Sequence, residues 1–248
     1  MINKWIAHER YSAEAEMNLF CFAFPGGSAS YFAPWKKLID SRINVLPVLY
    51  PQRETRAKEK MHRNFEEFVK DFVETNKELL SKPYAFFGYC GGAVVAYDCC
   101  RYAASLGLAQ PLFGVAASSE APEYLKDTLP EVDEGESYDK IKEYLTGLEI
   151  FDKAMLENDL FLRYYLPMLK ADCDLYRTYD YKQFRLSSEL VVMRAVDDKS
   201  VSEEKAGEWR NVADSDISQI TVEGGHFFVD KKTDMVCELI NKKFIDRR

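Results

Sequence analysis

The chain has 248 residues, of which 47% are hydrophobic and 30% are charged, and its formal net charge is −8. This length and apolar content fit one large folded domain and exclude a disordered chain. The acidic balance, with no basic patch interleaved with aromatic residues, argues against nucleic acid as a partner.

The cysteines and the first 15 residues indicate the cellular compartment. The six cysteines show neither a Cys-x-x-Cys pair nor metal-type spacing with histidine, so we expect reduced thiols, with no metal and no cofactor. Residues 1–15 lack the apolar core of a signal peptide, and no apolar run approaches the ~20 residues that span a bilayer. We therefore expect a cytoplasmic protein that does not associate with membranes.

Apolar runs rich in aromatic and β-branched residues predict strands that are buried on both faces. These runs cover 17–24, 44–49, 84–87, 112–117, 189–195 and 217–222. Amphipathic spacing predicts helices between them, at 30–39, 62–80, 91–106, 203–210 and 230–244. This alternation predicts an α/β fold with a mostly parallel central sheet flanked by helices. Because Pro47 cannot donate a ladder hydrogen bond, it should lie in an edge strand or at a strand end.

The interval 121–187 interrupts this alternation. It is rich in tyrosine, its apolar spacing is helical, and it contains no predicted strand. We expect it to be a helical lid, inserted within a single domain 1–248 and lying over the strand ends, where open α/β sheets place their sites. The alternative is a structural subdomain without a gating role. One predicted helix is kinked at Pro167, and its apolar face comprises Leu160, Phe161, Tyr164, Tyr165, Met168 and Leu169.

The segment 88–92, Gly-Tyr-Cys-Gly-Gly, follows a predicted strand and opens a predicted helix. It has the Gly-x-Cys-x-Gly layout of a nucleophile elbow, with cysteine where serine usually stands. The glycines remove bulk beside a strained turn, and the N-terminal amides of the helix favour a thiolate. Cys90 is therefore the candidate nucleophile, and the alternative is a buried structural cysteine.

A cysteine nucleophile needs a base, and the base needs an acid that orients it. Of the three histidines, His226 is favoured because it follows a buried strand in a Gly-Gly loop, whereas His8 and His62 lie in polar or helix-start positions. Asp197 and Asp198 both follow another strand, and Asp198 is favoured because it lies further past the strand end. The order Cys, Asp, His is that of the α/β-hydrolase triad.

An oxyanion hole requires two hydrogen-bond donors. The first candidate is the N–H of Gly91, the residue after the nucleophile. The second should come from the loop that follows the first strand. Because Pro25 has no N–H, either Phe24 or Gly26 must donate there, and Phe24 is favoured.

Together these segments resemble the type II thioesterases of nonribosomal peptide and polyketide synthesis, a branch of the α/β-hydrolase fold. The resemblance covers essentially the whole chain, and the segments that carry it are 19–30, 49–53, 166–172 and 224–228. Three positions depart from the family pattern. Cys90 replaces the usual serine, Gly91 replaces a common methionine, and Pro25 replaces a small residue that has an N–H.

The resemblance implies an acyl thioester substrate on the phosphopantetheine arm of an acyl or peptidyl carrier protein. It implies a thioesterase for editing or product release in antibiotic biosynthesis, working through an acyl-enzyme on Cys90. Contact with the carrier protein would involve insertion residues such as Arg163, Lys170 and Arg177. The alternatives are a Cys-dependent acyltransferase, a hydrolase of small esters, or a carrier-protein binding module without catalysis.

Overall fold

The computed structural model describes residues 3–7, 11–127, 129–130, 139–148, 151 and 153–247, so His8 lies outside it. A six-stranded sheet with the order β2-β1-β3-β4-β5-β6 forms its centre, and each neighbouring pair is parallel. The strands are β1 (Met17–Phe22), β2 (Ile43–Pro47), β3 (Tyr84–Tyr89), β4 (Phe113–Ala117), β5 (Glu189–Ala195) and β6 (Ser218–Val222). This confirms the predicted α/β fold. Pro47 ends the edge strand β2, as its missing N–H requires.

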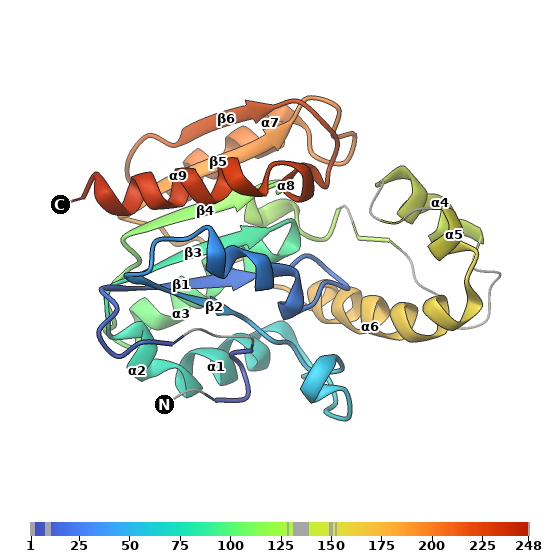
Figure 1. Cartoon of the computed structure of the whole chain (residues 1–248), viewed down its shortest axis with the longest axis horizontal. Coiled ribbons are helices and arrows are strands. Elements are labelled where there is room, and N and C mark those ends of the chain that lie inside the picture. Colours follow the sequence, from blue (N-terminus) through green and yellow to red (C-terminus); the bar gives the residue numbers. More distant parts are fainter. Residues whose placement is uncertain are drawn as a thin grey trace.

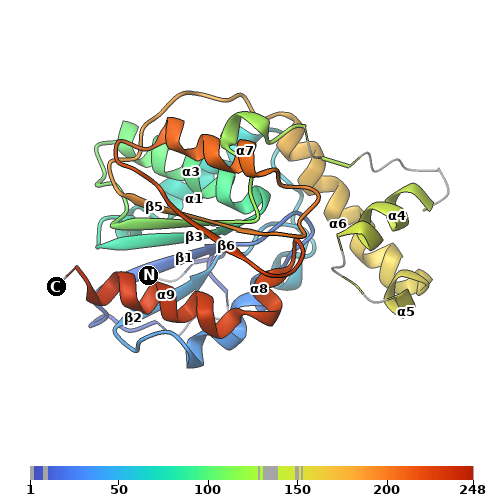
Figure 2. The same cartoon turned by 90° about the horizontal axis from the view of Figure 1, so that it is seen from above.

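Helices cover both faces of the sheet (Figures 1 and 2). On one face lie α1 (Phe65–Thr75), α3 (Gly91–Ser105) and α7 (Glu203–Gly207), with the short α2 (Lys77–Leu80) beside α1. The other face is covered by α9 (Thr233–Ile245), which follows α8 (Phe228–Lys231), and by a 3-10 helix, Ala29–Lys37. Among the described residues, no helix is long and apolar enough to cross a bilayer.

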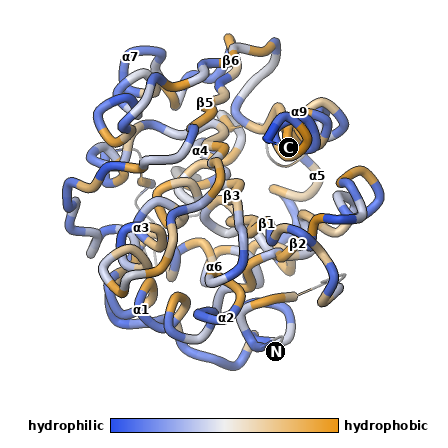
Figure 3. Tube along the Cα trace, turned by 90° about the vertical axis from the view of Figure 1, so that its left-hand side faces the viewer, coloured by the Kyte–Doolittle hydropathy of each residue, from blue (hydrophilic) through white to orange (hydrophobic). Residues whose placement is uncertain are grey.

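Two hydrophobic cores lie on opposite sides of the sheet, because successive strand residues point to opposite faces. Phe20 and Phe86 join the core beneath α1 and α3, whereas Leu19 and Phe87 join the core beneath α9. Strands β1 to β4 are buried throughout and need no polar alternation, which is why they are mostly apolar runs. The prediction of a buried strand at 217–222 was wrong, because β6 lies at the sheet edge and is only partly buried. Figure 3 shows these hydrophobic strands at the centre and more hydrophilic segments on the outer helices.

Several predicted helices differ from the structure in type or extent. The segment predicted as a helix at 30–39 is a 3-10 helix that contains Pro34, whose missing N–H cannot serve an α-helical ladder. The predicted helix 62–80 begins at Phe65 and divides at Asn76, whose side-chain amide donates to Phe72 O over 2.8 Å. The last predicted helix divides into α8 and α9 at Lys232.

The insertion between β4 and β5 contributes α4 (Asp139–Gly147), α5 (Lys153–Leu156) and α6 (Asp159–Arg177). These helices lie beyond the carboxyl ends of the strands (Figures 1 and 2). Helix α6 continues through Pro167. The prediction for its inner face was wrong at Leu160 and Tyr164, which are 79% and 60% exposed. The buried row runs through Leu162 and Leu166, and two positions along a helix correspond to a rotation of about 200°.

Candidate active site

Cys90 lies in a strained turn between β3 and α3. Its φ of 52° and ψ of −130° are unfavourable for a residue with a side chain. Close packing explains the flanking glycines, since a Cβ would lie 2.2 Å from Ala93 Cα at Gly88 and 2.4 Å from Ala23 O at Gly92. The Cys90 N–H donates to Ala117 O over 2.8 Å and so ties the turn to the end of β4. The turn has the geometry of a nucleophile elbow, and Cys90 is partly exposed there, whereas the other five cysteines are buried.

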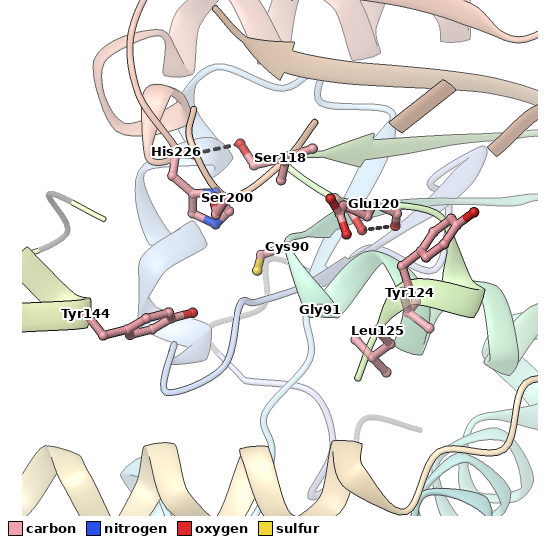
Figure 4. A pocket seen from close by; sticks show the side chains of 12 residues that line it. Cys90, Gly91, Ser118, Glu120, Tyr124, Leu125, Tyr144, Ser200 and His226 are labelled. Carbon is pink, nitrogen blue, oxygen red and sulfur yellow. Dashed lines mark hydrogen bonds between the residues drawn. The ribbon is translucent and has the colours of Figure 1, made fainter. Parts of the chain in front are cut away.

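His226 lies in the loop after β6 and is only 5% exposed. Its carbonyl oxygen accepts a hydrogen bond from Tyr89 Oη over 3.0 Å. It also accepts one from Ser118 Oγ over 2.7 Å, which Figure 4 shows. These donors lie at the ends of β3 and β4, so the backbone of His226 is fixed to the strands beside the elbow. Sequence reasoning missed both donors. The available signal was a polar residue, Ser118, directly after an apolar strand.

A carboxylate orients the His226 ring. Nδ1 lies 2.8 Å from Asp198 Oδ2 and 2.8 Å from Ser200 Oγ. Ser200 also donates to Asp198 Oδ1, through Oγ over 2.7 Å and through its N–H over 2.9 Å. Asp198 is 7% exposed, whereas Asp197 is exposed and uses its N–H to bind Gly224 O. Of the two carboxylates left open by the sequence, Asp198 therefore contacts the histidine, and Ser200 is an additional contact that was not predicted.

Each charged group of this site shifts the pKa of its neighbour toward the ionised form. Burial opposes protonation of His226, but the negative charges of Cys90 and Asp198, with the hydrogen bond to Asp198, raise the pKa of His226 to about 10. Burial also opposes ionisation of Asp198, but its hydrogen bond with His226 and the charge of His226 hold the pKa of that carboxyl below its usual value. Because Nδ1 faces Asp198, Nε2 is the nitrogen left for proton transfer at Cys90.

The two predicted oxyanion donors are the N–H groups of Gly91 and Phe24. Gly91 is the first residue of α3, so its N–H has no acceptor within the helix. The Gly26 N–H is already donated to Asp172 Oδ2 over 2.7 Å. For the Phe24 N–H, no acceptor is found in the described part of the chain. Of the two residues that the sequence left open, Phe24 is thus the one with an available donor.

A buried ion pair fixes the loop that carries Phe24. Arg53 and Asp172 are both fully buried and pair directly, and Arg53 also donates to Gly27 O. Asp172 belongs to α6, so the insertion binds the Gly26 N–H directly and reaches the Gly27 carbonyl through Arg53. Sequence reasoning assigned no role to either residue, since nothing in a sequence distinguishes a buried ion pair from two exposed charges.

Two small cavities, about 30 Å³ and 40 Å³, meet at Cys90. Their shared wall comprises Cys90, Gly91, Leu125, Tyr144 and His226. The first, called the polar cavity below, has the more polar wall of the two and is shown in Figure 4, with Ser118, Ser119, Glu120 and Ser200 on its wall. The second is apolar and includes Phe24, Leu145, Leu148, Leu169 and Phe227. A thioester has a different group on each side of its carbonyl, and two unlike cavities suit such a substrate.

The remaining predicted residues lie apart from these cavities. His62 pairs with Asp71 over 3.0 Å and stacks on Trp5, so its role is structural. Lys170 and Arg177 both form ion pairs with Asp174 within α6. Arg163 is exposed on the same helix.

A parallel sheet with an elbow cysteine after β3 and a His–Asp pair after β6 and β5 defines an α/β hydrolase. The chain belongs to the thioesterase domain family, whose model matches residues 17–244. It is therefore an enzyme of the hydrolase class that acts on thioester bonds.

Known proteins are similar over nearly the full length. The linear gramicidin dehydrogenase LgrE of Brevibacillus parabrevis is 27% identical, across 96% of this chain and 91% of that protein. The RedJ thioesterase of the prodiginine pathway in Streptomyces coelicolor has a similar structure, with a TM-score of 0.85, 24% identity, and coverage of 93% of this chain and 91% of that one. The type II thioesterase BorB of the borrelidin cluster gives a TM-score of 0.82 at 23% identity, with coverage of 96% and 97%. These structures confirm the predicted α/β-hydrolase fold.

The names of these relatives cover two different reactions, because one is a dehydrogenase and two are thioesterases. The assignment to thioester hydrolysis therefore rests on the family model.

Proposed function

We propose that this chain is a type II thioesterase that hydrolyses acyl thioesters on the phosphopantetheine arm of acyl or peptidyl carrier proteins. The observation that carries the proposal is the 2.8 Å contact between His226 Nδ1 and Asp198 Oδ2, in a site shared with the strained Cys90. The family model supports the thioester. Relatives named for gramicidin and borrelidin support a role in nonribosomal peptide or polyketide biosynthesis.

In the first half-reaction, the Cys90 thiolate attacks the carbonyl carbon of the thioester. The carbon–sulfur bond to pantetheine then breaks, and the departing sulfur takes the proton from His226 Nε2. The products are an acyl group on Cys90 and a free pantetheine thiol. A His226 pKa of about 10 keeps this general acid protonated at neutral pH.

The second half-reaction needs His226 as a base, and acylation itself brings about that change. Once Cys90 is acylated, it no longer carries the negative charge that helps to raise the pKa of His226. The pKa of His226 therefore falls, and the neutral imidazole takes a proton from water. The hydroxyl adds to the carbonyl, Cys90 leaves as a thiolate, and the acid is released with His226 protonated again.

Each half-reaction passes through a tetrahedral intermediate with a negative oxygen. We assign its stabilisation to the N–H groups of Gly91 and Phe24. The start of α3 supports the first donor, and the occupation of the Gly26 N–H by Asp172 supports the second. One such donor typically accounts for about 10²- to 10³-fold in rate.

The insertion 121–187 acts as a lid within the single domain 1–248 in this proposal. Its residues Tyr144, Leu145 and Leu148 line the cavities at Cys90. Cavities of about 30 and 40 Å³ are small beside the ~300 Å³ or more of an ordinary ligand pocket. The insertion must therefore shift to admit an acyl-pantetheine arm.

The test follows an acetyl-phosphopantetheine carrier protein and this enzyme together by intact mass spectrometry. We expect free acetate, a deacylated carrier protein and a transient acyl adduct on the enzyme, all abolished in Cys90→Ala. The matched control is Cys99→Ala, because Cys99 lies in the helix that follows Cys90 but is buried. This variant should retain turnover.

Three outcomes would overturn hydrolysis. An adduct that only an added amine resolves would show an acyltransferase. Cleavage of p-nitrophenyl acetate without cleavage of the carrier thioester would show a small-ester hydrolase. Binding of the carrier protein with no adduct and no acid would show a binding module.

A further inference from the structure

The polar cavity at Cys90 contains a carboxylate that the triad does not use. Glu120 lies in the loop after β4, and its side chain is 8% exposed. Apart from Glu120, His226 and Cys90, the polar side chains on the cavity wall are neutral hydroxyl groups of serine and tyrosine. Figure 4 shows Glu120 across the cavity from Cys90 and His226. A buried charge in such a place is costly unless it has partners.

The partners of Glu120 leave acceptor capacity unfilled. Lys205 Nζ forms an ion pair with Oε2 at 3.4 Å that lacks the geometry of a hydrogen bond, and this lysine is shared with Asp127 at 3.4 Å. The Ser202 N–H lies 3.4 Å from Oε1. Both contacts are long, and Lys205 is 35% exposed, so solvent screens its charge.

The backbone around Glu120 is held firmly. Trp209 Nε1 donates to Ser119 O over 3.1 Å, and Ala121 N–H donates to Lys205 O over 3.1 Å. Ser119 Oγ donates to the carbonyl of Glu120 over 2.9 Å. The backbone therefore holds Glu120 at the cavity wall before any substrate binds, which lowers the entropic cost of using its side chain.

The arrangement of the cavities indicates which end of the substrate reaches Glu120. The apolar cavity shares Leu148, His226 and Phe227 with a third cavity of about 280 Å³, which extends to Lys231 and Lys232. A pantetheine arm must run out to its carrier protein, so the larger cavity suits it. The acyl group then occupies the polar cavity of about 30 Å³, which contains Glu120 and has room for only a few atoms.

We propose that Glu120 binds an ammonium group on the acyl chain, so that the enzyme prefers short amino-acyl thioesters. This inference rests on the proposed thioesterase function and names its substrate class. An ammonium group supplies the hydrogen bonds that Oε2 lacks. An apolar acyl group of the same size leaves the carboxylate unsatisfied, and an anionic acyl group meets repulsion.

The test compares three pantetheine thioesters: β-alanyl, its neutral isostere butyryl, and anionic malonyl. The wild-type enzyme should hydrolyse the β-alanyl thioester with a kcat/KM at least about tenfold above that for butyryl, with malonyl slowest. In Glu120→Gln, the β-alanyl to butyryl ratio should fall about tenfold. The control is Glu123→Gln, which changes an exposed carboxylate in the 3-10 helix directly after this loop and should keep the wild-type ratio.

Lys205→Met tests the same inference in the opposite direction. Removing the cation that competes for Glu120 should raise the β-alanyl to butyryl ratio, which loss of a merely structural ion pair would not do. Equal hydrolysis of the β-alanyl and butyryl thioesters by the wild-type enzyme, or an unchanged ratio in both Glu120→Gln and Lys205→Met, would overturn the inference and leave thioester hydrolysis intact. No hydrolysis of any of the three thioesters or of the acylated carrier protein would overturn the proposed function itself.

Discussion

The sheet and the helical insertion build the site in different ways. The sheet fixes the backbone of both reacting residues: the Cys90 N–H donates to Ala117 O, and the His226 carbonyl accepts from the hydroxyl groups of Tyr89 and Ser118. The insertion contributes through side chains, above all Asp172 on the Gly26 loop. The bonds from the sheet hold the reacting residues themselves, whereas the Asp172 contact holds only the loop beside them. We therefore expect the reacting groups to stay fixed, while access to them depends on how α6 packs.

Helix α6 packs directly against both sides of the candidate oxyanion hole. A Cβ at Gly91 would lie 2.4 Å from Tyr176, and a Cβ at Gly26 would lie 2.5 Å from Tyr165 Oη. This close packing leaves no room for a side chain at position 91. A shift of α6 would therefore also move the loop that carries Phe24. We infer that the movement that admits the substrate also changes the oxyanion hole.

The largest expected effect concerns Cys90, which the sheet positions. Cys90→Ala removes the nucleophile, so kcat/KM for an acyl-carrier protein should fall about 10³-fold or more. The helix and sheet should remain folded, because Cys90 is partly exposed. Steady-state kinetics with circular dichroism as the folding control checks this, and turnover above a tenth of wild type would contradict it.

The next effect concerns the insertion. Asp172→Ala leaves the Arg53 guanidinium buried without its partner, which should cost about 3–5 kcal/mol in the free energy of unfolding. Because the Gly26 N–H also loses its acceptor, we expect kcat to fall more than KM changes. Asp174→Ala on the same helix, with a side chain 51% exposed, should cost under about 1 kcal/mol. Urea titration and kinetics measure both, and equal losses for the two variants would show that Asp172 is an ordinary surface charge.

A third prediction is the pH dependence of kcat/KM. His226 acts as an acid in the first half-reaction, so kcat/KM should stay high until His226 loses its proton at about pH 10 and then fall with increasing pH. Asp198→Asn removes a charge that raises the pKa of His226, so the falling limb should move to lower pH. Profiles from about pH 6 to about pH 11, corrected for chemical hydrolysis, measure this limb. An identical limb in both enzymes would mean that Asp198 does not tune His226.

The smallest expected effect is at Ser200. Its Oγ contacts both Asp198 and His226, but the direct 2.8 Å contact between those two residues remains without it. Ser200→Ala should therefore lower kcat by about tenfold, the equivalent of one hydrogen bond, with KM little changed. Ser202→Ala, which removes a helix cap away from His226, is the matched control and should keep the wild-type kcat.

The sheet was the part of the molecule that could be predicted from sequence. Strands buried on both faces are apolar runs, and the elbow glycines and the order of Cys90, Asp198 and His226 are local patterns. The contacts that crossed between elements were not predictable. Ser118 binds His226 across 108 positions, and Asp172 binds Gly26 across 146. The predicted inner face of α6 was wrong in part, because an apolar residue such as Leu160 can lie exposed on a surface helix.

The central claim is that the acyl group passes through the sulfur of Cys90 and then to water. Rapid acid quench of the enzyme with butyryl-phosphopantetheine carrier protein, followed by peptide mapping, tests it most directly. We predict a butyryl group on the peptide that contains Cys90, formed before butyrate appears and decaying as butyrate accumulates. Butyrate formed at the full rate with no acyl group on that peptide, or an acyl group on any other residue, would contradict the account.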